Sequence, residues 1–566
     1  MRVCVIGAGA SGLVAMKEVI AEGHDPICYE AAFEIGGVFS RDEASRRTAD
    51  STYLTISNVY MAFSDTVVGL KKFWHASEYI KYLEDYCQLH DLRKRIQFRH
   101  NVRQVQKIEN HWQVEIENLD THTVLTVTFD AVAVCSGSHQ YPRYPTIPGL
   151  ETFPNLTLHA AQFRDATSFR GKKVVVVGIG ESAADILADV AQQSAECHLV
   201  MRSYPFIVSR MIGNYTFDTF TSNLFYPGSL TRPVHWLLII ILSILIFPIS
   251  LLFRFMRLLF PNQKKIKQDA FGQKEKMADW KTPDTKQFRR LLLDWVLKSD
   301  ASNIKKFGLK NSRFLPFVME GKITPHLGEI RSIQGSKIIF NDGKIVIADA
   351  MIYATGYQTI FPFLKGIEVP ENNIRNLFKH AFLPANEPTL VFIGYVRPTA
   401  GGIPICSEMV ARYWALLLSK KKTLPENIAE LTQKERAQEE KMHYLSPALN
   451  TVVNGVGFLE SMSRLIGCEV PYFSYLINPN IFFRLLCGTT IGHRYRLRGP
   501  HANPAVALKM IRTLELGQPP EVLALMATFK LLSLSGFGSG DMVYDIMRTI
   551  RFCLRKRRSY DSKNVC

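Results

Sequence analysis

The chain lacks the cysteine spacings that mark a metal centre or a redox-active disulfide. Its 10 cysteines in 566 residues contain no CxxC pair and no zinc-type spacing. No cysteine stands between Cys28 and Cys87, where a flavoprotein disulfide reductase would carry its redox pair. We therefore predict no metal site and free thiols in a reducing compartment, and the pattern argues against a disulfide reductase. The sequence also shows no nucleophile elbow.

Acidic residues are too few to balance the basic ones, and the formal net charge is +17. The basic residues do not interleave with a recognisable nucleic-acid motif, so we predict no nucleic-acid partner. They gather instead directly after an apolar run that ends at residue 253, and in the tail at 548–558. This placement suits anionic lipid headgroups, with a solvated charged face as the alternative.

The apolar run at 235–253 contains no Lys, Arg, Asp or Glu, and its length is close to the roughly 20 residues that span hydrocarbon. Pro248 interrupts it, and a single crossing would put two parts of one domain on opposite sides of the membrane. We therefore expect a re-entrant or in-plane helix, with a buried core helix as the alternative. Residues 474–535 are apolar enough to lie on a bilayer but too broken to span it.

No signal peptide precedes the first motif, because the chain opens inside an apolar strand. The expected location is therefore a membrane surface with the catalytic domains facing the cytosol, which is the endoplasmic reticulum membrane if the organism is eukaryotic.

A glycine-rich turn, VCVIGAGASGLVA, occupies residues 3–15 between an apolar strand and a helix. Gly7 allows the tight turn, Gly9 lets a pyrophosphate approach the backbone, and Gly12 lets helix and strand pack closely. The helix N-terminus then faces the phosphates. Glu30 ends the next strand, where a carboxylate accepts hydrogen bonds from a ribose. The predicted cofactor contacts here are Gly7, Ala8, Gly9, Ala10, Ser11, Gly12 and Glu30.

A second turn of the same kind, VVVVGIGESAADI, occupies residues 174–186. The strand that follows ends at Arg202, where the first unit has its glutamate. A guanidinium at that point partners a 2′-phosphate, which favours NADPH over NADH; a solvated strand-end arginine is the alternative. The predicted contacts of this second turn are Gly178, Gly180, Ser182, Ala183, Asp185, Arg202 and Ser203.

The strand after the first turn ends in Glu30, whereas the strand after the second ends in Arg202. This difference predicts two different dinucleotides, and FAD with NADPH is the pair that reacts together. Strands that run into glycine turns at 131–137 and 344–358 are expected to pass near the flavin, through Gly137, Thr355 and Gly356. Residues 113–130 alternate like a β-meander.

The predicted fold class is α/β, with two Rossmann-like dinucleotide-binding domains, a membrane-associated apolar insertion and a helical C-terminal region. The expected boundaries are 1–160 with 325–420 for a discontinuous FAD domain, 165–324 for the NADPH domain with its insertion at 204–300, and 421–566 for the C-terminal region.

From residue 1 to about 420 the chain resembles the flavin-containing monooxygenases. The stretches that carry the resemblance are EIGGVF (34–39), LTISNVYMAFSD (54–65), GIGESAADI (178–186), ATGYQTIFPFL (354–364) and 394–415 with Pro404, Glu408 and Arg412. The resemblance implies that Gly37, Val38 and Phe39 lie near the isoalloxazine. It also implies that Ser57 and Asn58 lie at the flavin–NADP⁺ junction, with Asn58 in the catalytic role.

The resemblance implies that NADPH reduces FAD, that dioxygen forms a hydroperoxide at flavin C4a, and that a soft nitrogen or sulfur atom of a lipophilic small molecule is oxygenated. A Baeyer–Villiger ketone monooxygenase, an NADPH oxidase releasing hydrogen peroxide, and a nucleotide-binding scaffold without turnover remain as alternatives. One departure concerns the linker signature at 153–163, in which Asn155 replaces a glycine of the family while His159 is kept. Oligomeric state is not predicted.

Overall fold

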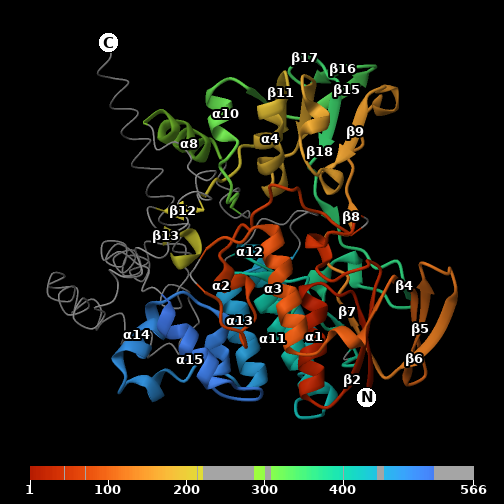
Figure 1. The fold of residues 1–566 in the computed structure, drawn as a ribbon, viewed down its shortest axis with the longest axis vertical. Coiled ribbons are helices and arrows are strands. Elements are labelled where there is room, and N and C mark those ends of the chain that lie inside the picture. Colours follow the sequence, from red (N-terminus) through yellow and green to blue (C-terminus); the bar gives the residue numbers. More distant parts are fainter. Residues whose placement is uncertain are drawn as a thin grey trace.

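The computed structural model describes residues 1–514, except 44, 70–71, 209, 213–214, 221–285, 300–307, 386, 400 and 443–450. The predicted apolar segment at 235–253, most of the 204–300 insertion and the basic tail lie outside the described residues. Figure 1 shows two lobes stacked along the long axis, each built around a sheet.

The lower lobe contains a parallel sheet in the order β21-β7-β1-β2-β3. Its strands are β1 (Arg2–Ile6), β2 (Asp25–Glu30), β3 (Ile96–Phe98), β7 (Ala131–Val134) and β21 (Leu390–Phe392). Strand β7 is buried at every residue, as expected for a short apolar run covered on both faces. The carboxyl ends of these strands therefore meet at one edge.

Helices cover one face of this sheet, and a second sheet, antiparallel apart from one short parallel strand, covers the other. The helices of this lobe are α1 (Ala10–Ala21), α2 (Asn58–Met61), α3 (Ala76–Leu89) and α11 (Ile403–Leu418), with α1 packed along α11. The opposite face packs on β4 (His100–Ile108), β5 (His111–Asn118), β6 (Val124–Phe129) and the short β20 (Leu364–Lys365). Strands β5 and β6 confirm the predicted meander at 113–130.

The upper lobe contains a second parallel sheet in the order β14-β11-β10-β18-β9. Its strands are β9 (Leu156–His159), β10 (Lys173–Val177), β11 (Glu196–Met201), β14 (Ile323–Leu327) and β18 (Ala350–Tyr353). Around this sheet lie α4 (Glu181–Gln193), α8 (Lys286–Lys298), α10 (Leu315–Met319) and an antiparallel sheet of β15 (Ile330–Gln334), β16 (Lys337–Phe340) and β17 (Ile345–Ile347). Two nucleotide-type sheets are thus present, as the two glycine turns predict.

The predicted boundary at 325 is wrong for the strands that follow it. Strand β18 pairs with β10 from Val174↔Ala350 to Val177↔Tyr353, and β14 pairs with β11, so residues 325–353 lie in the upper lobe. A short apolar strand ending in glycine fits either sheet, and only its pairing partner decides between them. The chain crosses between lobes at β8 (Tyr141–Pro142) and returns at β19 (Tyr357–Gln358), which pair antiparallel.

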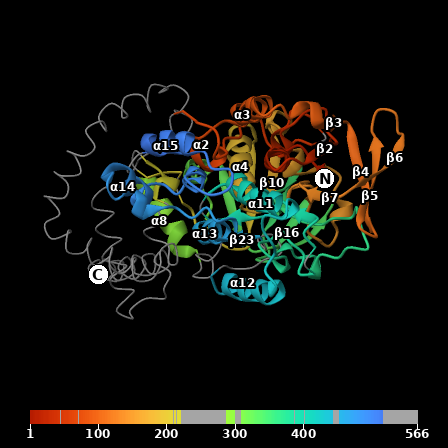
Figure 2. The same ribbon diagram turned by 90° about the horizontal axis from the view of Figure 1, so that it is seen from below.

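The described part of the C-terminal region is largely helical and packs on the lower lobe (Figures 1 and 2). Its elements are α12 (Ile428–Met442), β23 (Val452–Val453), α13 (Gly455–Ile466), α14 (Pro479–Cys487) and α15 (Pro504–Thr513), and β23 pairs with β22 (Arg397–Pro398). A short pair, β12 (Met211–Ile212) with β13 (Tyr215–Thr216), opens the insertion. Among the described residues, no helix combines the length and the apolarity needed to cross a membrane.

Candidate functional site

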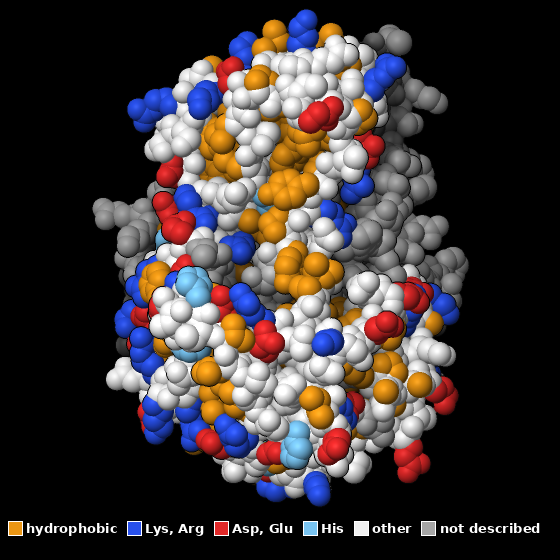
Figure 3. Space-filling view, turned by 90° about the vertical axis from the view of Figure 1, so that its right-hand side faces the viewer, with side chains coloured by type: hydrophobic (Ala, Val, Ile, Leu, Met, Phe, Trp, Pro, Cys, Tyr) orange, Lys and Arg blue, Asp and Glu red, His pale blue; other side chains and the backbone are white. Residues whose placement is uncertain are grey.

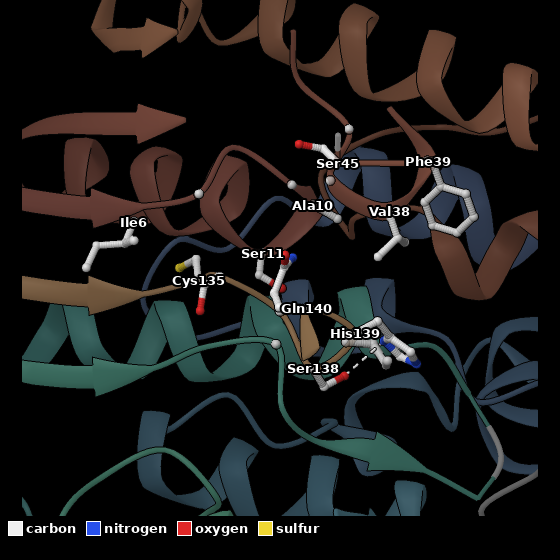
Figure 4. A pocket seen from close by; sticks show the side chains of 18 of the residues that line it. Ile6, Ala10, Ser11, Val38, Phe39, Ser45, Cys135, Ser138, His139 and Gln140 are labelled. Atoms are coloured by element: carbon white, nitrogen blue, oxygen red, sulfur yellow. Dashed lines mark hydrogen bonds between the residues drawn. The ribbon is translucent and has the colours of Figure 1, made fainter. Parts of the chain in front are cut away.

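A cavity of about 720 Å³ opens at the carboxyl edge of the lower sheet. Loops that follow four of the five strands reach it, as expected for a ligand site in an open parallel sheet. Nine of the residues predicted as cofactor contacts line it: Gly7, Gly9, Ala10, Ser11, Glu30, Gly37, Val38, Phe39 and Gly137. Figure 4 shows Ala10 and Ser11 facing this space from the first turn, and Val38 and Phe39 facing it from the segment after β2.

The glycines of the first turn have the geometry that their spacing predicts. Gly7 has a φ of +100°, and a Cβ on it would lie 2.9 Å from the Cys135 carbonyl oxygen. A Cβ on Gly12 would lie only 1.8 Å from the Gly7 carbonyl oxygen, so α1 packs too closely on the turn for any side chain. Gly9 faces Gly37 at ordinary contact distance. This leaves bare backbone for a pyrophosphate at the N-terminus of α1.

Glu30 is buried at the end of β2 and lines the cavity. Its Oε2 accepts the Ala8 amide N–H at 2.6 Å and its Oε1 accepts that of Ala32 at 2.9 Å. Burial raises the pKa of Glu30, and these two amide donors oppose the rise. Each oxygen keeps a lone pair for a ribose hydroxyl, so the cavity fits the adenosine half of FAD.

The other end of the cavity has an apolar wall built from Phe39, Leu54, Ile56, Met61 and Tyr79. The Phe39 and Tyr79 rings meet edge to face at 5.0 Å. The Tyr79 hydroxyl is buried with no hydrogen-bond partner among the described groups. An orphaned phenol in a largely apolar pocket fits a site that a polar, planar ligand completes.

The structure places Asn58 behind this wall. Its side-chain Oδ1 accepts the Lys72 backbone N–H at 3.0 Å, and its backbone N–H donates to the Lys72 carbonyl oxygen at 2.8 Å. The Ser57 amide donates to Asp218 of the insertion at 2.6 Å. Neither residue is among those that line the cavity, whereas the neighbouring Thr55 is. The catalytic role of Asn58 therefore stays a prediction.

Ser64, near the end of the 54–65 stretch, has a structural role. The Ser64 amide donates to Glu408 at 2.9 Å, and Arg496 donates to the Ser64 hydroxyl at 2.8 Å. Arg496 also pairs directly with Glu408. Arg412 donates to two backbone carbonyls of the same C-terminal segment. Two of the residues that carry the resemblance at 394–415 thus attach the C-terminal region to the lower lobe.

The second glycine turn repeats the first in the upper lobe. Gly178 has a φ of +110°, and a Cβ on it would lie 2.4 Å from the Ala354 carbonyl oxygen. A Cβ on Gly180 would meet nothing within 4 Å. Ala183 is buried against the sheet, and Ser182 is exposed on the first turn of α4. The turn therefore fits a second pyrophosphate, with Gly180 facing its space.

The remaining predicted contacts of the second unit divide into two kinds. Asp185 is held by the chain itself, accepting from Asn311 at 2.6 Å and from Arg313 at 3.2 Å. Arg202 is exposed and Ser203 half-buried directly after β11. The position of Arg202 fits a 2′-phosphate, and Asp185 holds the loop beside the turn.

The turn at 354–356 lies in the linker crossing, away from the described cavity lining. Thr355 donates its hydroxyl to the Arg143 carbonyl, and the Gly356 carbonyl accepts the Arg143 amide at 2.9 Å. Neither Thr355 nor Gly356 lines the cavity, and the strand that precedes them, β18, pairs in the upper sheet. Their contact with the flavin therefore stays a prediction.

In the linker signature at 153–163, the asparagine that replaces the family's glycine forms hydrogen bonds of its own. Asn155 donates from its side-chain nitrogen to the Ala348 carbonyl at 2.9 Å and to Ser336 at 3.1 Å, both in the upper lobe. His159 is fully buried, and its Nδ1 accepts the Ala161 amide N–H at 3.1 Å. Burial lowers the pKa of His159 to about 4, so it is neutral at physiological pH.

Several cavity residues escaped the sequence reasoning, among them the ionisable side chains of His139, Lys310 and Arg397. Burial lowers the pKa of His139 to about 4. Its Nδ1 lies within hydrogen-bond distance of the Ser138 hydroxyl, at 3.1 Å, and Figure 4 shows this hydrogen bond as a dashed line. Lys310 and Arg397 come from opposite sides of the junction between the lobes. Arg397 stands in the 394–415 stretch that carries the resemblance, whereas Lys310 follows the 204–300 insertion and belongs to no recognised motif.

Among the described residues, no group of three or more His, Cys, Asp or Glu side chains is placed to hold a metal ion. On the face in Figure 3, Lys and Arg side chains alternate with Asp and Glu, so the basic excess forms no single patch there.

Comparison with known proteins identifies the family. The model of the flavin-binding monooxygenase-like family matches residues 1–227 and 274–515, so the likeness extends well past the predicted end near 420. A 4-hydroxybenzoate brominase (decarboxylating) of Marinomonas mediterranea is 33% identical over 505 residues, covering 88% of this chain and 90% of that protein. Flavin-containing monooxygenase 5 of Homo sapiens is 28% identical over 522 residues, covering 88% and 89%.

Solved structures share the fold. Cyclohexanone monooxygenase from Rhodococcus sp. Phi1, bound to NADP⁺, superposes with a TM-score of 0.57 at 15% identity and covers 84% of this chain and 98% of its own. S-allyl-L-cysteine S-oxygenase from Allium sativum gives 0.55 at 21% identity, covering 82% and 88%. The chain belongs to the flavin-binding monooxygenase-like family and is an NADPH-dependent flavin monooxygenase whose cofactors are FAD and NADPH.

Proposed function

We propose that the enzyme transfers one oxygen atom of O₂ to a soft nucleophilic nitrogen or sulfur atom of a small organic molecule. The observation that carries the proposal is that one cavity is lined both by the first dinucleotide turn and by Lys310. The Lys310 amide donates to Glu181, the residue directly after the second turn, at 2.7 Å. This contact supports a reaction space that both dinucleotide sites adjoin.

The chain's own residues bind, orient and exclude water. The first turn and Glu30 hold the nucleotide half of FAD, and the wall formed by Phe39, Leu54 and Met61 keeps water from the reacting end. When bound, reduced FAD supplies the oxygen activation, so the protein needs no nucleophile or metal of its own. Neutral His139 adds a hydrogen-bonding group to the wall without adding charge.

A second candidate is oxidation of a halide for the halogenation of a phenol. It is favoured by the 33% identity to a 4-hydroxybenzoate brominase, against 28% to flavin-containing monooxygenase 5. Ketone insertion, as in a Baeyer–Villiger enzyme, draws support from shared fold alone, at 15% identity.

We also propose that the protein associates with a membrane, with its catalytic lobes facing the cytosol, at the endoplasmic reticulum if the organism is eukaryotic. Besides the apolar segment 235–253, one described feature supports this. Phe473, Leu476 and Ile477 are 68%, 53% and 95% exposed on one turn beside α14. Such a tip is suited to insertion among lipid headgroups.

The reaction is tested by reducing the purified holoenzyme anaerobically with NADPH and mixing it with oxygenated buffer in a stopped-flow spectrophotometer. We expect an absorbing flavin species that differs from both the oxidised and the reduced forms and decays faster with substrate. Amines, sulfides, ketones, and bromide with a phenol are then compared as substrates. Immediate return to oxidised flavin with stoichiometric hydrogen peroxide would contradict the proposal and indicate an NADPH oxidase.

Replacing Gly180 by alanine tests the second dinucleotide site separately. Its φ is −105° and a Cβ would meet nothing within 4 Å, so the fold should be unaffected. The methyl group would occupy the space of the NADPH pyrophosphate, so we expect KM for NADPH to rise roughly tenfold or more, about 1.4 kcal/mol of binding. FAD content and Tm should match wild type; an unchanged KM would place NADPH elsewhere.

A further inference from the structure

A short segment of the lower lobe, residues 45–51, reaches across to the upper lobe and returns. We call this segment the strap. The chain leaves the cavity wall after Val38 and Phe39 and rejoins it at Leu54, and all three residues line the cavity. Ser45, the first residue of the strap, lines the cavity as well (Figure 4). Both ends of the strap therefore adjoin the wall around the flavin site.

Backbone hydrogen bonds hold both ends of the strap in the lower lobe. The Arg47 backbone N–H donates to the Val38 carbonyl oxygen at 3.0 Å. Directly after the strap, the Thr52 carbonyl oxygen accepts the backbone N–H of Ala76, the first residue of α3, at 3.0 Å. A displacement of the strap is therefore passed to the cavity wall on both sides.

The C-terminal half of the strap is held by the upper lobe. Ala49 is buried and belongs to the hydrophobic core of that lobe. The Asp50 backbone N–H donates to the Arg164 carbonyl oxygen at 2.8 Å. The Ser51 hydroxyl donates to Oδ2 of Asp189 at 2.5 Å. Asp189 lies on α4, so the strap is attached to the helix that begins at the second glycine turn.

The Arg164 side chain makes a second attachment. Arg164 lies between β9 and β10 of the upper sheet. Its Nε donates to Oε2 of Glu43 at 2.6 Å, and its terminal nitrogen donates to the carbonyl oxygens of Glu43 and Arg46, both at 3.3 Å. The other terminal nitrogen donates to the Ala161 carbonyl oxygen of its own lobe at 3.0 Å. The rigid, planar guanidinium thus joins the two lobes in a fixed geometry.

We propose that these two attachments, the Ser51–Asp189 hydrogen bond and the Arg164 guanidinium, position the NADPH lobe against the flavin cavity for hydride transfer. The donor belongs to the second glycine turn and the acceptor to the cavity of the lower lobe, so the transfer distance depends on how the lobes are held. A misplacement of about 1 Å can cost about a hundredfold in rate. None of the three residues lines the cavity, so they are positioning residues.

Anaerobic measurements on the holoenzyme test the proposal in the variants Ser51→Ala and Arg164→Met. Asp189 keeps its ion pair with Arg313 at 3.1 Å in Ser51→Ala, so the carboxylate is not left alone. Stopped-flow reduction over a range of NADPH concentrations gives the limiting rate of flavin reduction and the Kd separately. Titration of the oxidised holoenzyme with NADP⁺ gives the change in the flavin spectrum, which does not depend on turnover.

The matched controls remove equivalent interactions within one lobe. Ser461→Ala removes a hydroxyl that donates to the Phe458 carbonyl oxygen at 2.7 Å within α13. Arg99→Met removes an ion pair with Asp120 at 2.9 Å, beside the sheet of β4, β5 and β6. Neither contact joins the two lobes.

We expect the limiting rate of reduction to fall roughly tenfold or more in both variants, about 1.4 kcal/mol of activation free energy. The Kd of NADP⁺ should stay within about twofold of wild type, because the second turn still binds it. The change in the flavin spectrum at saturating NADP⁺ should become smaller. Ser51→Thr and Arg164→Lys should recover part of the rate, and both controls should behave as wild type.

An unchanged limiting rate and spectral change in both variants would overturn the proposal. A fall in rate that comes with equal losses of Tm, FAD content and NADP⁺ affinity would also overturn it, because the attachments would then only stabilise the fold. Flavin reduction precedes the reaction with oxygen, so the inference holds for any oxygenated substrate. A failed test of oxygen transfer would leave it standing.

Discussion

Replacing Gly12 by alanine is expected to leave a protein that no longer retains FAD. The new Cβ would lie 1.8 Å from the Gly7 carbonyl oxygen and 3.5 Å from Cγ1 of Val5, so α1 must move away from β1. Overpacking of this kind costs about 1–3 kcal/mol or more, and the shift opens the turn that holds the pyrophosphate. The ratio of flavin to protein absorbance and the Tm measure both effects.

Gly9→Ala is the matched control for that experiment. A Cβ on Gly9 would lie 3.6 Å from the Gly37 Cα, which is ordinary contact, and its φ of −75° suits alanine. We expect a Tm of the apoprotein near that of wild type, with weaker FAD binding because the methyl group occupies the approach of the phosphate. Stoichiometric FAD and an unchanged Tm in Gly12→Ala would show that the helix does not pack on the turn as described.

Replacing Arg496 by methionine is expected to destabilise the whole lower lobe. The Arg496 side chain is 1% exposed and pairs with both Glu18 of α1 and Glu408 of α11. Removing it leaves two carboxylates buried, with Lys17 at 3.0 Å still beside Glu18. Breaking a buried ion network typically costs about 3–5 kcal/mol. Urea denaturation of the holoenzyme measures the loss.

Arg498→Met is the control, two residues along the chain. Arg498 and Glu469 lie 3.7 Å apart with half-exposed side chains, so this pair should contribute less than about 1 kcal/mol. Equal destabilisation by the two variants would contradict the assignment of Arg496 to a buried network.

The buried network of Arg496 and Glu18 predicts that the stability of the fold depends on pH. Burial alone would raise the pKa of Glu18, but Arg496 and Lys17 hold it well below its ordinary value. A carboxyl group whose folded-state pKa is depressed stabilises the fold above its ordinary pKa and loses that contribution as the pH falls towards the folded value. The free energy of unfolding of the wild type should therefore fall as the medium becomes acidic. In Arg496→Met, the free energy of unfolding should change less with pH.

Local features of the site could be read from the sequence because local backbone geometry requires them. Gly7 and Gly178 need a positive φ, Gly12 excludes any side chain, and Glu30 ends the strand that presents it to a ribose. Each requirement is met within a short stretch of chain. The spacing of residues alone therefore identified both dinucleotide turns and, through them, the cofactors.

Tertiary structure alone decided which distant segments meet. The strand at 350–353 has the same pattern whichever sheet receives it, and its pairing with β10 moved the domain boundary. Arg496 reaches Glu18 across 478 positions of the chain, and Lys310 and Arg397 meet one cavity from separate lobes. Such contacts depend on which buried charges and apolar faces find partners when the lobes pack, and no periodicity or short motif records that choice.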